Sequence, residues 1–324
     1  MKVKIIAEAG LNHNGSFKNA KKLIDIAKYS GADYVKFQLY DTNELYNQFL
    51  NEKFKKVFKK FLKREFTFFQ WSKLISYSKS KKIKLFFSVF DIKSLKKLKK
   101  FKINIVKVPS GEITNYPLLK EIQRMKLDVI ISTGMASLKE ISKSVNLLKG
   151  CNIILMHCIS EYPTTDPKLN YIKFLKKKFP NCKIGFSDHT KETFWPAISI
   201  YHGSEFIEKH FTFNKNIKLG DHHMSLNKEE LKEMVDLVRI NQNFIKLKKA
   251  KEISKSEKIL KNLSRKGVYF SKDMKKNEKV KYSDIKLLRP LVGISSEKIN
   301  HIVGKVLNKD IKAYHPLSLN IFKK

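Results

Sequence analysis

Short apolar runs alternate with longer amphipathic stretches along the chain up to about residue 247. The short runs are rich in β-branched and aromatic residues, which favour β-strands. The longer stretches repeat apolar residues every three or four positions with lysines between them, the pattern of helices that bury one face. We predict strands at 3–8, 34–38, 84–90, 104–110, 128–133, 152–158, 183–188 and 205–210.

Eight strands separated by helical stretches predict a (β/α)8 barrel, an α/β fold that typically needs about 250 residues. The clearest helical stretches lie at 17–31, 138–150 and 227–243, whereas the stretch at 94–101 is short for a barrel helix. An open doubly wound sheet would usually have fewer strands and a glycine-rich first turn. The pattern therefore favours the closed barrel.

The pattern changes after residue 247. Residues 248–262 are rich in lysine, and the residues that follow contain short strand-like runs broken by Lys, Asn, Pro and Gly. We expect a barrel domain over 1–247, a charged linker over 248–262 and a small β-rich domain over 263–324. Because a domain of that size has a small core, we expect it to be stabilised by packing against the barrel or against another subunit.

The chain has 324 residues and a formal net charge of +37. Lysines are spread over most of the chain on the polar sides of helical stretches, and we find no nucleic-acid-binding motif, so we expect no nucleic-acid partner. Such charge could still steer small anions. We find no signal peptide or membrane span, and Cys151, Cys158 and Cys182 lack metal-ligand spacing. These features predict a cytoplasmic protein with reduced thiols and no membrane partner.

Polar residues recur where the predicted strands end, and barrel enzymes carry their active sites on that face. His189 and His210 follow the seventh and eighth strands, so both side chains reach the same mouth of the barrel. One such histidine alone would more often be structural. A pair of neutral imidazoles is a good ligand set for Mn²⁺ or Zn²⁺, and we therefore predict a metal site.

Lys36 and Lys107 interrupt apolar strands, and a buried ammonium group needs an anionic partner or a lowered pKa. Two interpretations follow: a Schiff-base lysine of an aldolase, or two cations that bind phosphate and carboxylate groups. Small hydroxyl donors at the strand ends favour the second interpretation. These donors are Ser88, Ser110, Ser132 and Ser187.

Acidic residues lie near the same strand ends. Glu8 and Glu112 suit a catalytic role and ion pairs with the two lysines about equally well. Asp221 lies in a loop after the last strand and is a candidate to bind substrate hydroxyls. Its neighbours His222 and His223 are expected at the surface.

Ordered motifs along nearly the whole chain resemble the N-acetylneuraminate (sialic acid) synthases and related nonulosonic-acid synthases. The motifs are IIAEAGLNHNG, ADYVKFQ, VKVPSGEITN, ISTGM, HCISEYPT, GFSDHT, EKHFT, DHHMS and, near the carboxyl end, LLRP. The resemblance implies that the last part of the chain is an antifreeze-like (SAF) domain. It also implies a domain-swapped homodimer, in which this domain reaches over the partner's active site.

The resemblance further implies roles for individual residues. His189 and His210 would bind Mn²⁺, or Mg²⁺ in its place, and Glu8, Lys36 and Lys107 would be catalytic. The residues implied to bind phosphoenolpyruvate are Lys36, Ser88, Lys107, Ser110, Ser132 and Ser187. Those implied to bind the acylamino sugar are Gln38, Glu112, Tyr162, Asp221 and, from the other subunit, Arg289.

The implied reaction joins phosphoenolpyruvate to the open-chain aldehyde of N-acetylmannosamine, or a related acylamino sugar, and releases phosphate. Ser160 and Glu161 precede Tyr162 in a region where relatives that use N-acetylmannosamine often have Asn. The alternative is therefore a synthase of legionaminic or pseudaminic acid that uses a modified hexose. A Schiff-base aldolase and a basic binding protein on an inactive barrel are the more distant hypotheses.

Overall fold

The computed structural model describes residues 2–245 and 252–323. Contacts between residues divide the chain into two compact units, Met1–Lys246 and Leu247–Lys324. Residues 248–251 of the expected linker lie outside the described residues. The rest of that segment contains most of helix α11, Lys255–Ser264, which begins with a capping box formed by Ser254 and Glu257.

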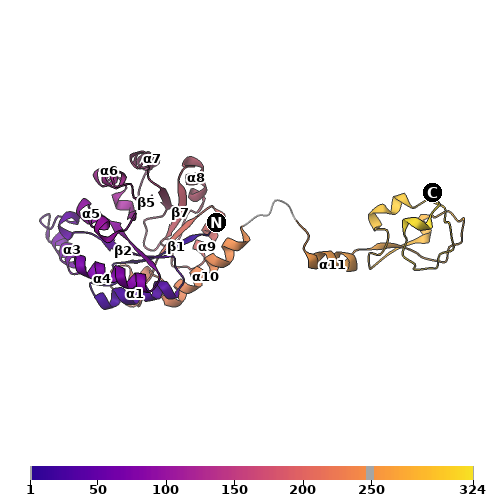
Figure 1. Ribbon diagram of the computed structural model, residues 1–324, viewed down its shortest axis with the longest axis horizontal. Coiled ribbons are helices and arrows are strands. Elements are labelled where there is room, and N and C mark those ends of the chain that lie inside the picture. Colours follow the sequence, from indigo (N-terminus) through magenta and orange to yellow (C-terminus); the bar gives the residue numbers. More distant parts are fainter. Residues whose placement is uncertain (1, 246–251, 324) are drawn as a thin grey trace. The chain divides into compact units, whose positions relative to one another are not determined.

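The first unit is a closed barrel of eight parallel strands that follow one another in chain order, with β8 pairing back onto β1 (Figure 1). This closure confirms the predicted (β/α)8 fold. Every predicted strand is present, with ends that shift by a few residues. The strands are β1 Lys4–Gly10, β2 Tyr34–Leu39, β3 Lys84–Val89, β4 Ile105–Val108, β5 Asp128–Ser132, β6 Ile153–His157, β7 Lys183–Asp188 and β8 Phe206–His210.

Helices connect the strands and bury their apolar faces against the sheet. Several begin at a side-chain cap, such as the capping boxes of Ser137 with Glu140 and of Asn227 with Glu230. The stretch that we considered short is a ten-residue helix, α5. The helices are α1 Phe17–Tyr29, α2 Thr42–Leu45, α3 Glu52–Leu62, α4 Phe68–Ser80, α5 Ile92–Phe101, α6 Tyr116–Arg124, α7 Leu138–Leu147, α8 Asn170–Lys178, α9 Trp195–Tyr201 and α10 Lys228–Phe244.

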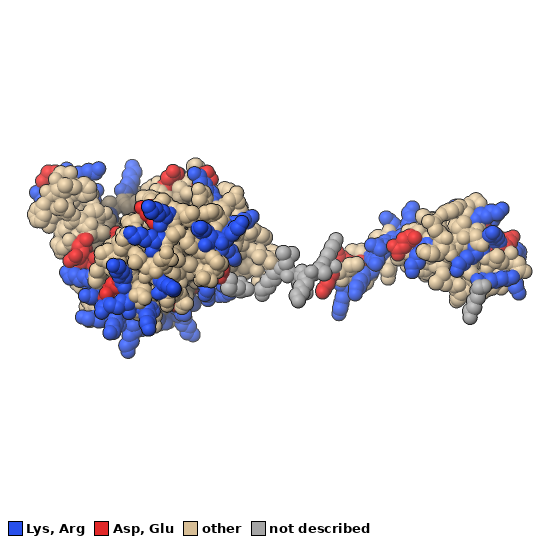
Figure 2. Space-filling view, turned by 90° about the horizontal axis from the view of Figure 1, so that it is seen from above, with Lys and Arg blue, Asp and Glu red and all other residues tan. Residues whose placement is uncertain are grey.

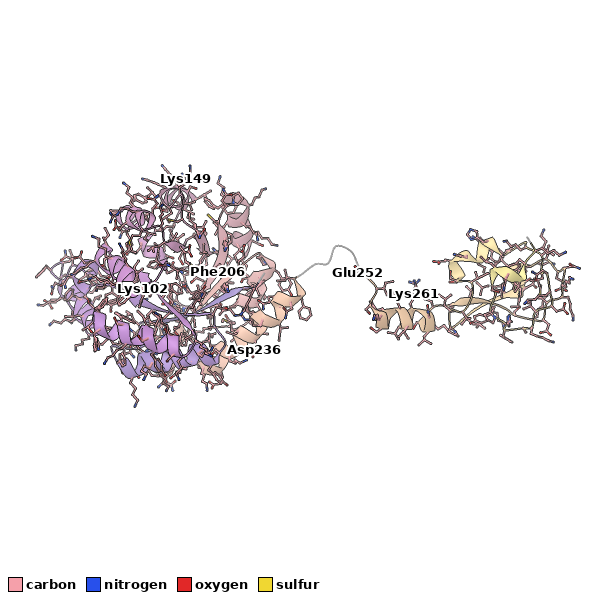
Figure 3. All side chains as sticks on the ribbon, viewed as in Figure 1. Lys102, Lys149, Phe206, Asp236, Glu252 and Lys261 are labelled. Carbon is pink, nitrogen blue, oxygen red and sulfur yellow. The ribbon has the colours of Figure 1, made fainter. Side chains whose placement is uncertain are left out.

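The core of this unit lies between the strands and the helices. Phe37, Phe87 and Ile207 are buried completely, as their β-rich sequence context predicts. Side chains fill the unit in Figure 3, where Phe206 lies near the centre and the exposed Lys149 lies at the outer edge. A core of this extent holds the strand ends rigidly, which is what a site built from several strands requires.

The second unit has a small β core of its own. Strands β9 (Gly267–Phe270) and β10 (Ile285–Leu288) pair antiparallel, and isolated bridges join further segments to them. Val268, Phe270 and Leu317 are among its buried residues. Gly293 has φ +74°, and a Cβ there would lie 2.0 Å from the Leu317 carbonyl oxygen, so only glycine fits this turn.

On the face that Figure 2 shows, basic side chains lie on both units. All three cysteines are free thiols. In the part of the chain that the structure describes, every helix is too short or too polar to cross a bilayer.

Candidate active site

A cavity of about 200 Å³ lies at the carboxyl ends of the barrel strands. Every residue predicted for the site lines this cavity except Glu112 and Arg289. Those that line it are Glu8, Lys36, Gln38, Ser88, Lys107, Ser110, Ser132, Tyr162, Ser187, His189, His210 and Asp221. The barrel therefore brings together side chains from all eight strands or the loops that follow them.

The two lysines are buried and each has a carboxylate partner. Lys36 Nζ contacts the Glu8 carboxylate and donates to Ser88 Oγ at 2.6 Å. Lys107 Nζ lies 2.9 Å and 3.0 Å from the two carboxylate oxygens of Glu208. The Glu8 pair was one of our interpretations, but the partner of Lys107 is Glu208, which we had not assigned to the site.

Glu208 is the central acid of the cavity. It also accepts from Ser187 Oγ at 3.0 Å, and Lys36 Nζ lies 3.8 Å from its Oε2. Burial opposes its ionisation, but the nearby Lys107 and Lys36 prevail and lower the pKa of Glu208 to about 2. Strand alternation could have revealed it, because it lies two residues before His210 and so faces the same side.

The pKa of Glu8 shifts in the opposite direction to that of Glu208. Burial raises the pKa of the Glu8 carboxyl, and the negative charge of Glu208 adds to this effect, while Lys36 and His210 oppose it. Burial likewise lowers the pKa of Lys107 against the attraction of Glu208. Glu8 and Glu208 thus face Lys36 and Lys107, and Asp221 adds a third carboxylate to the lining of the cavity. Of the two buried acids, Glu8 is the more ready to carry a proton.

His189 is held as a neutral imidazole. Its Nδ1 lies 2.6 Å from the Ile159 carbonyl oxygen, which can only accept, so Nδ1 carries the proton and Nε2 keeps its lone pair. Burial, with His210 nearby, lowers the pKa of His189 to about 3. The ring of Tyr162 stacks on it at 4.1 Å between centroids.

His210 completes the pair. The two imidazole centroids are 5.8 Å apart, and His210 Nδ1 is buried and has no hydrogen-bond partner among residues 2–245 and 252–323. Asp221 Oδ2 lies 3.8 Å from that nitrogen. Two imidazoles with a carboxylate nearby fit a cation such as Mn²⁺. The described residues form no group of three or more His, Cys, Asp or Glu suited to a metal, so further ligands would come from substrate or water.

Two predicted sugar-binding residues lie away from the cavity or outside the barrel. Glu112 ends a 3-10 turn after β4, and its carboxylate accepts from Asn115 Nδ2 at 2.7 Å instead of facing the cavity. Arg289 belongs to the second unit, where it follows β10 with an exposed side chain. Its action on a partner's site stays a prediction.

The expectation for His222 is wrong. It is fully buried, with Nδ1 at 2.6 Å from Thr212 Oγ1 and Nε2 at 3.0 Å from Asn14 Nδ2. These bonds tie the loop after β8 to the loop after β1, and so they hold Asp221 at the mouth. His223 is exposed, as expected.

Gly134 packs tightly against the phosphate-binding side predicted for the cavity. A Cβ at this position would lie 2.2 Å from Ser160 Oγ and 2.9 Å from Ser110 Oγ. Ser110 Oγ is itself 3.2 Å from Cys158 Sγ. The absence of a side chain at 134 is therefore what lets Ser110 lie where it does.

Comparison with known proteins identifies the family of the chain. The model of the NeuB family matches residues 23–250, and the SAF domain model matches residues 265–320. The N,N'-diacetyllegionaminic acid synthase of Campylobacter jejuni is 37% identical over 96% of this chain and 97% of its own length. The pseudaminic acid synthase of the same species is 33% identical over 96% and 94%.

A solved structure gives the same result in three dimensions. The N-acetylneuraminic acid (sialic acid) synthetase of Leptospira borgpetersenii, crystallised with citrate, is 34% identical with a TM-score of 0.73 and covers 80% of this chain and 91% of its own. The family model spans most of the barrel, the relatives span nearly the whole chain, and the small β unit matches the SAF domain. The chain belongs to the NeuB family and is an enzyme of the nonulosonic-acid synthase type.

Proposed function

We propose that this enzyme condenses phosphoenolpyruvate with the open-chain aldehyde of N-acetylmannosamine or a related acylamino sugar, and with water, to give a nonulosonic acid and phosphate. The observation that carries the proposal is the cavity itself, where two buried lysines and four serines lie with two histidines. Cations and hydroxyl donors suit the phosphate and carboxylate of one substrate. The imidazoles suit a divalent cation beside the other.

Each group has a task in this reaction. Lys36, Lys107 and the serines would hold phosphoenolpyruvate so that its methylene carbon faces the sugar aldehyde. A new carbon–carbon bond forms there, and the aldehyde oxygen gains a proton and becomes a hydroxyl. Water adds to the carbon that bears the phosphate and loses one proton. The C–O bond to phosphate then breaks, the second proton of the water leaves with the phosphate, and the water oxygen becomes the keto oxygen. Glu8, with its raised pKa, is our candidate to take the proton that the water loses.

A divalent cation, Mn²⁺ or Mg²⁺, would be held by His189 and His210, and as a Lewis acid it would polarise the aldehyde oxygen. Tyr162, stacked on His189, and Asp221, 3.8 Å from His210, lie where they can contact the sugar next to the cation. Gln38 lines the same cavity. We assign the sugar to these three residues and, from a second subunit, to Arg289.

The identity of the sugar has two candidates. The main one is N-acetylmannosamine, and the alternative is a modified hexose that leads to legionaminic or pseudaminic acid. Two observations favour the alternative: the 37% identity to an N,N'-diacetyllegionaminic acid synthase, and Ser160 and Glu161 in the segment before Tyr162. A diacetamido hexose is therefore the first alternative substrate to try.

The test is phosphate release from phosphoenolpyruvate with each sugar, with and without Mn²⁺, and with mass spectrometry of the product. The proposal expects release that needs both sugar and cation, with a nine-carbon keto acid as product. The variant His210→Ala serves as the control and should release no phosphate. Absence of release with every acylamino sugar would refute the proposal.

A Schiff-base aldolase would use Lys36 or Lys107 as an unprotonated amine. Although burial lowers the pKa of Lys107, each lysine contacts a carboxylate that favours its ammonium form. Borohydride treatment with a keto acid separates the two reactions. A covalent adduct at either lysine would support the aldolase, and our proposal expects none.

A further inference from the structure

A second pair of opposite charges lies directly behind the two histidines. Strands β7 and β8 pair in register so that Asp188 is opposite Lys209. Each of these residues is next in sequence to one histidine of the cavity, and strand alternation turns both away from the cavity. Their side chains are at most 1% exposed, and Lys209 Nζ lies 2.6 Å from Asp188 Oδ2.

The network around the pair is closed. Lys209 Nζ also donates to the carbonyl oxygen of Thr190 at 2.6 Å and to its Oγ1 at 3.1 Å, so that its three N–H groups have three acceptors. Asp188 Oδ1 accepts from the Thr190 backbone N–H at 2.9 Å. The Lys209 side chain therefore binds Asp188 and Thr190, the two residues that flank His189. Lys209 itself directly precedes His210 in the sequence.

Stability alone does not explain the buried ion pair between Lys209 and Asp188. A buried ion pair is often no more stabilising than well-packed apolar side chains of similar volume. Its acceptors, however, have fixed directions, and they tie the backbone at 188 and 190 to the side chain at 209. An apolar pair would bury the same surface without specifying that geometry.

We infer that Lys209 and Asp188, together with Thr190, are positioning residues that fix His189 relative to His210 and thereby set the affinity of the site for a divalent cation. The inference rests on the proposed metal site and concerns groups that touch neither cation nor substrate. Partners of metal-binding histidines commonly change metal affinity by about tenfold to a hundredfold when they are replaced.

The experiment is a titration of the full-length protein with Mn²⁺ alone, followed by the electron paramagnetic resonance signal of the free ion. The variant Lys209→Met should raise the Kd at least about tenfold, and added Mn²⁺ should recover its activity. The matched control is Arg239→Met. It removes an ion pair of 2.6 Å with Asp33 at the other end of the barrel, and it should leave the Kd unchanged.

Two further variants separate positioning from folding. Lys209→Met combined with Asp188→Leu removes both charges and should regain thermal stability but not Mn²⁺ affinity. If Lys209→Met fails to fold, Thr190→Val keeps the ion pair and the shape of the side chain while it removes one acceptor. It should raise the Kd several-fold.

The results separate the positioning role of Lys209 and Asp188 from the proposed metal site at His189 and His210. If His210→Ala binds Mn²⁺ as tightly as the wild type, or if the wild type binds none, the metal site is wrong and the inference falls with it. If His210→Ala loses binding while folded Lys209→Met or Thr190→Val keeps the wild-type Kd, the inference alone is overturned. Equal weakening in Arg239→Met, or full recovery of affinity in the double variant, would also overturn it.

Discussion

Replacing Glu208 with Gln removes one negative charge from between two buried ammonium groups and leaves the shape of the side chain nearly unchanged. Lys107 Nζ lies 2.9 Å and 3.0 Å from the two carboxylate oxygens, and Lys36 Nζ lies 3.8 Å from one of them. In the variant, Lys107 would have no carboxylate partner among the described residues, while Lys36 would keep Glu8. The folded state must then hold an unpaired ammonium group or a deprotonated lysine.

Two estimates give the loss of unfolding free energy in Glu208→Gln. The pKa of Glu208 falls from 4.5 to about 2 on folding, and at 1.36 kcal/mol per pKa unit the ionised group contributes about 3 kcal/mol at neutral pH. Removal of one partner from a buried pair typically costs about 3–5 kcal/mol. We expect Glu208→Gln to lower the free energy of unfolding by about 3 kcal/mol at pH 7.

The assay is urea unfolding followed by tryptophan fluorescence, because Trp71 and Trp195, the two tryptophans of the chain, both lie in the barrel unit. The control Glu229→Gln changes an exposed residue of α10 and should alter the free energy by less than about 0.5 kcal/mol. Adding Lys107→Met to Glu208→Gln should recover part of the loss.

The pH dependence checks the cause. Because folding depresses the pKa of Glu208, its contribution is present above the unfolded value of 4.5 and is lost as the pH falls through about 2. The difference between wild type and Glu208→Gln should therefore narrow below pH 4.5. A loss of less than about 1 kcal/mol at pH 7, or a loss that Glu229→Gln reproduces, would refute the reasoning.

Three further outcomes follow from the site. Gly134→Ala should displace Ser110 Oγ and raise the KM for phosphoenolpyruvate about tenfold, with a smaller effect on the KM for the sugar. Unchanged kinetics would show that Ser110 does not bind phosphoenolpyruvate. Arg289→Ala should raise the KM for the sugar about tenfold or more and that for phosphoenolpyruvate far less, and equal effects would contradict its role. Deletion of the residues after Lys261 should abolish turnover and weaken the proposed dimer in sedimentation experiments, whereas a fully active truncated enzyme would show that the second unit does not complete the site.

The barrel could be predicted because its signal is local. Each strand is a short apolar run, and Lys36 and Lys107 stood out as charges inside such runs. The serines and histidines could be placed because parallel strands end on one face of a barrel. Both predictions use only the position of a residue within its own strand. They therefore do not depend on which side chains contact each other in the folded barrel.

The pairing of the acids could not be predicted in the same way. Lys107 and Glu208 are 101 residues apart and meet only when the barrel closes. Glu112 is much nearer to Lys107 in sequence, but the chain turns into a 3-10 helix at Ser110 and carries Glu112 aside. His222 looked like a surface residue for a related reason, because its partner Asn14 lies on another loop, 208 residues away, and Thr212 lies ten residues away in its own loop.

The balance of charge inside the barrel has a thermodynamic consequence. The formal net charge of the chain is +37, but in the cavity Lys36 and Lys107 are matched by Glu8 and Glu208, and Asp221 adds a third carboxylate. Because positive charge is not in excess in this cavity, a multiply charged anion that enters it must be accompanied by positive charge, whether a proton on Glu8, a divalent ion at the histidines or a guanidinium from a second chain. The apparent affinity for the anion is therefore linked to pH and to free cation concentration, and calorimetry in buffers of different ionisation enthalpy would register any proton uptake.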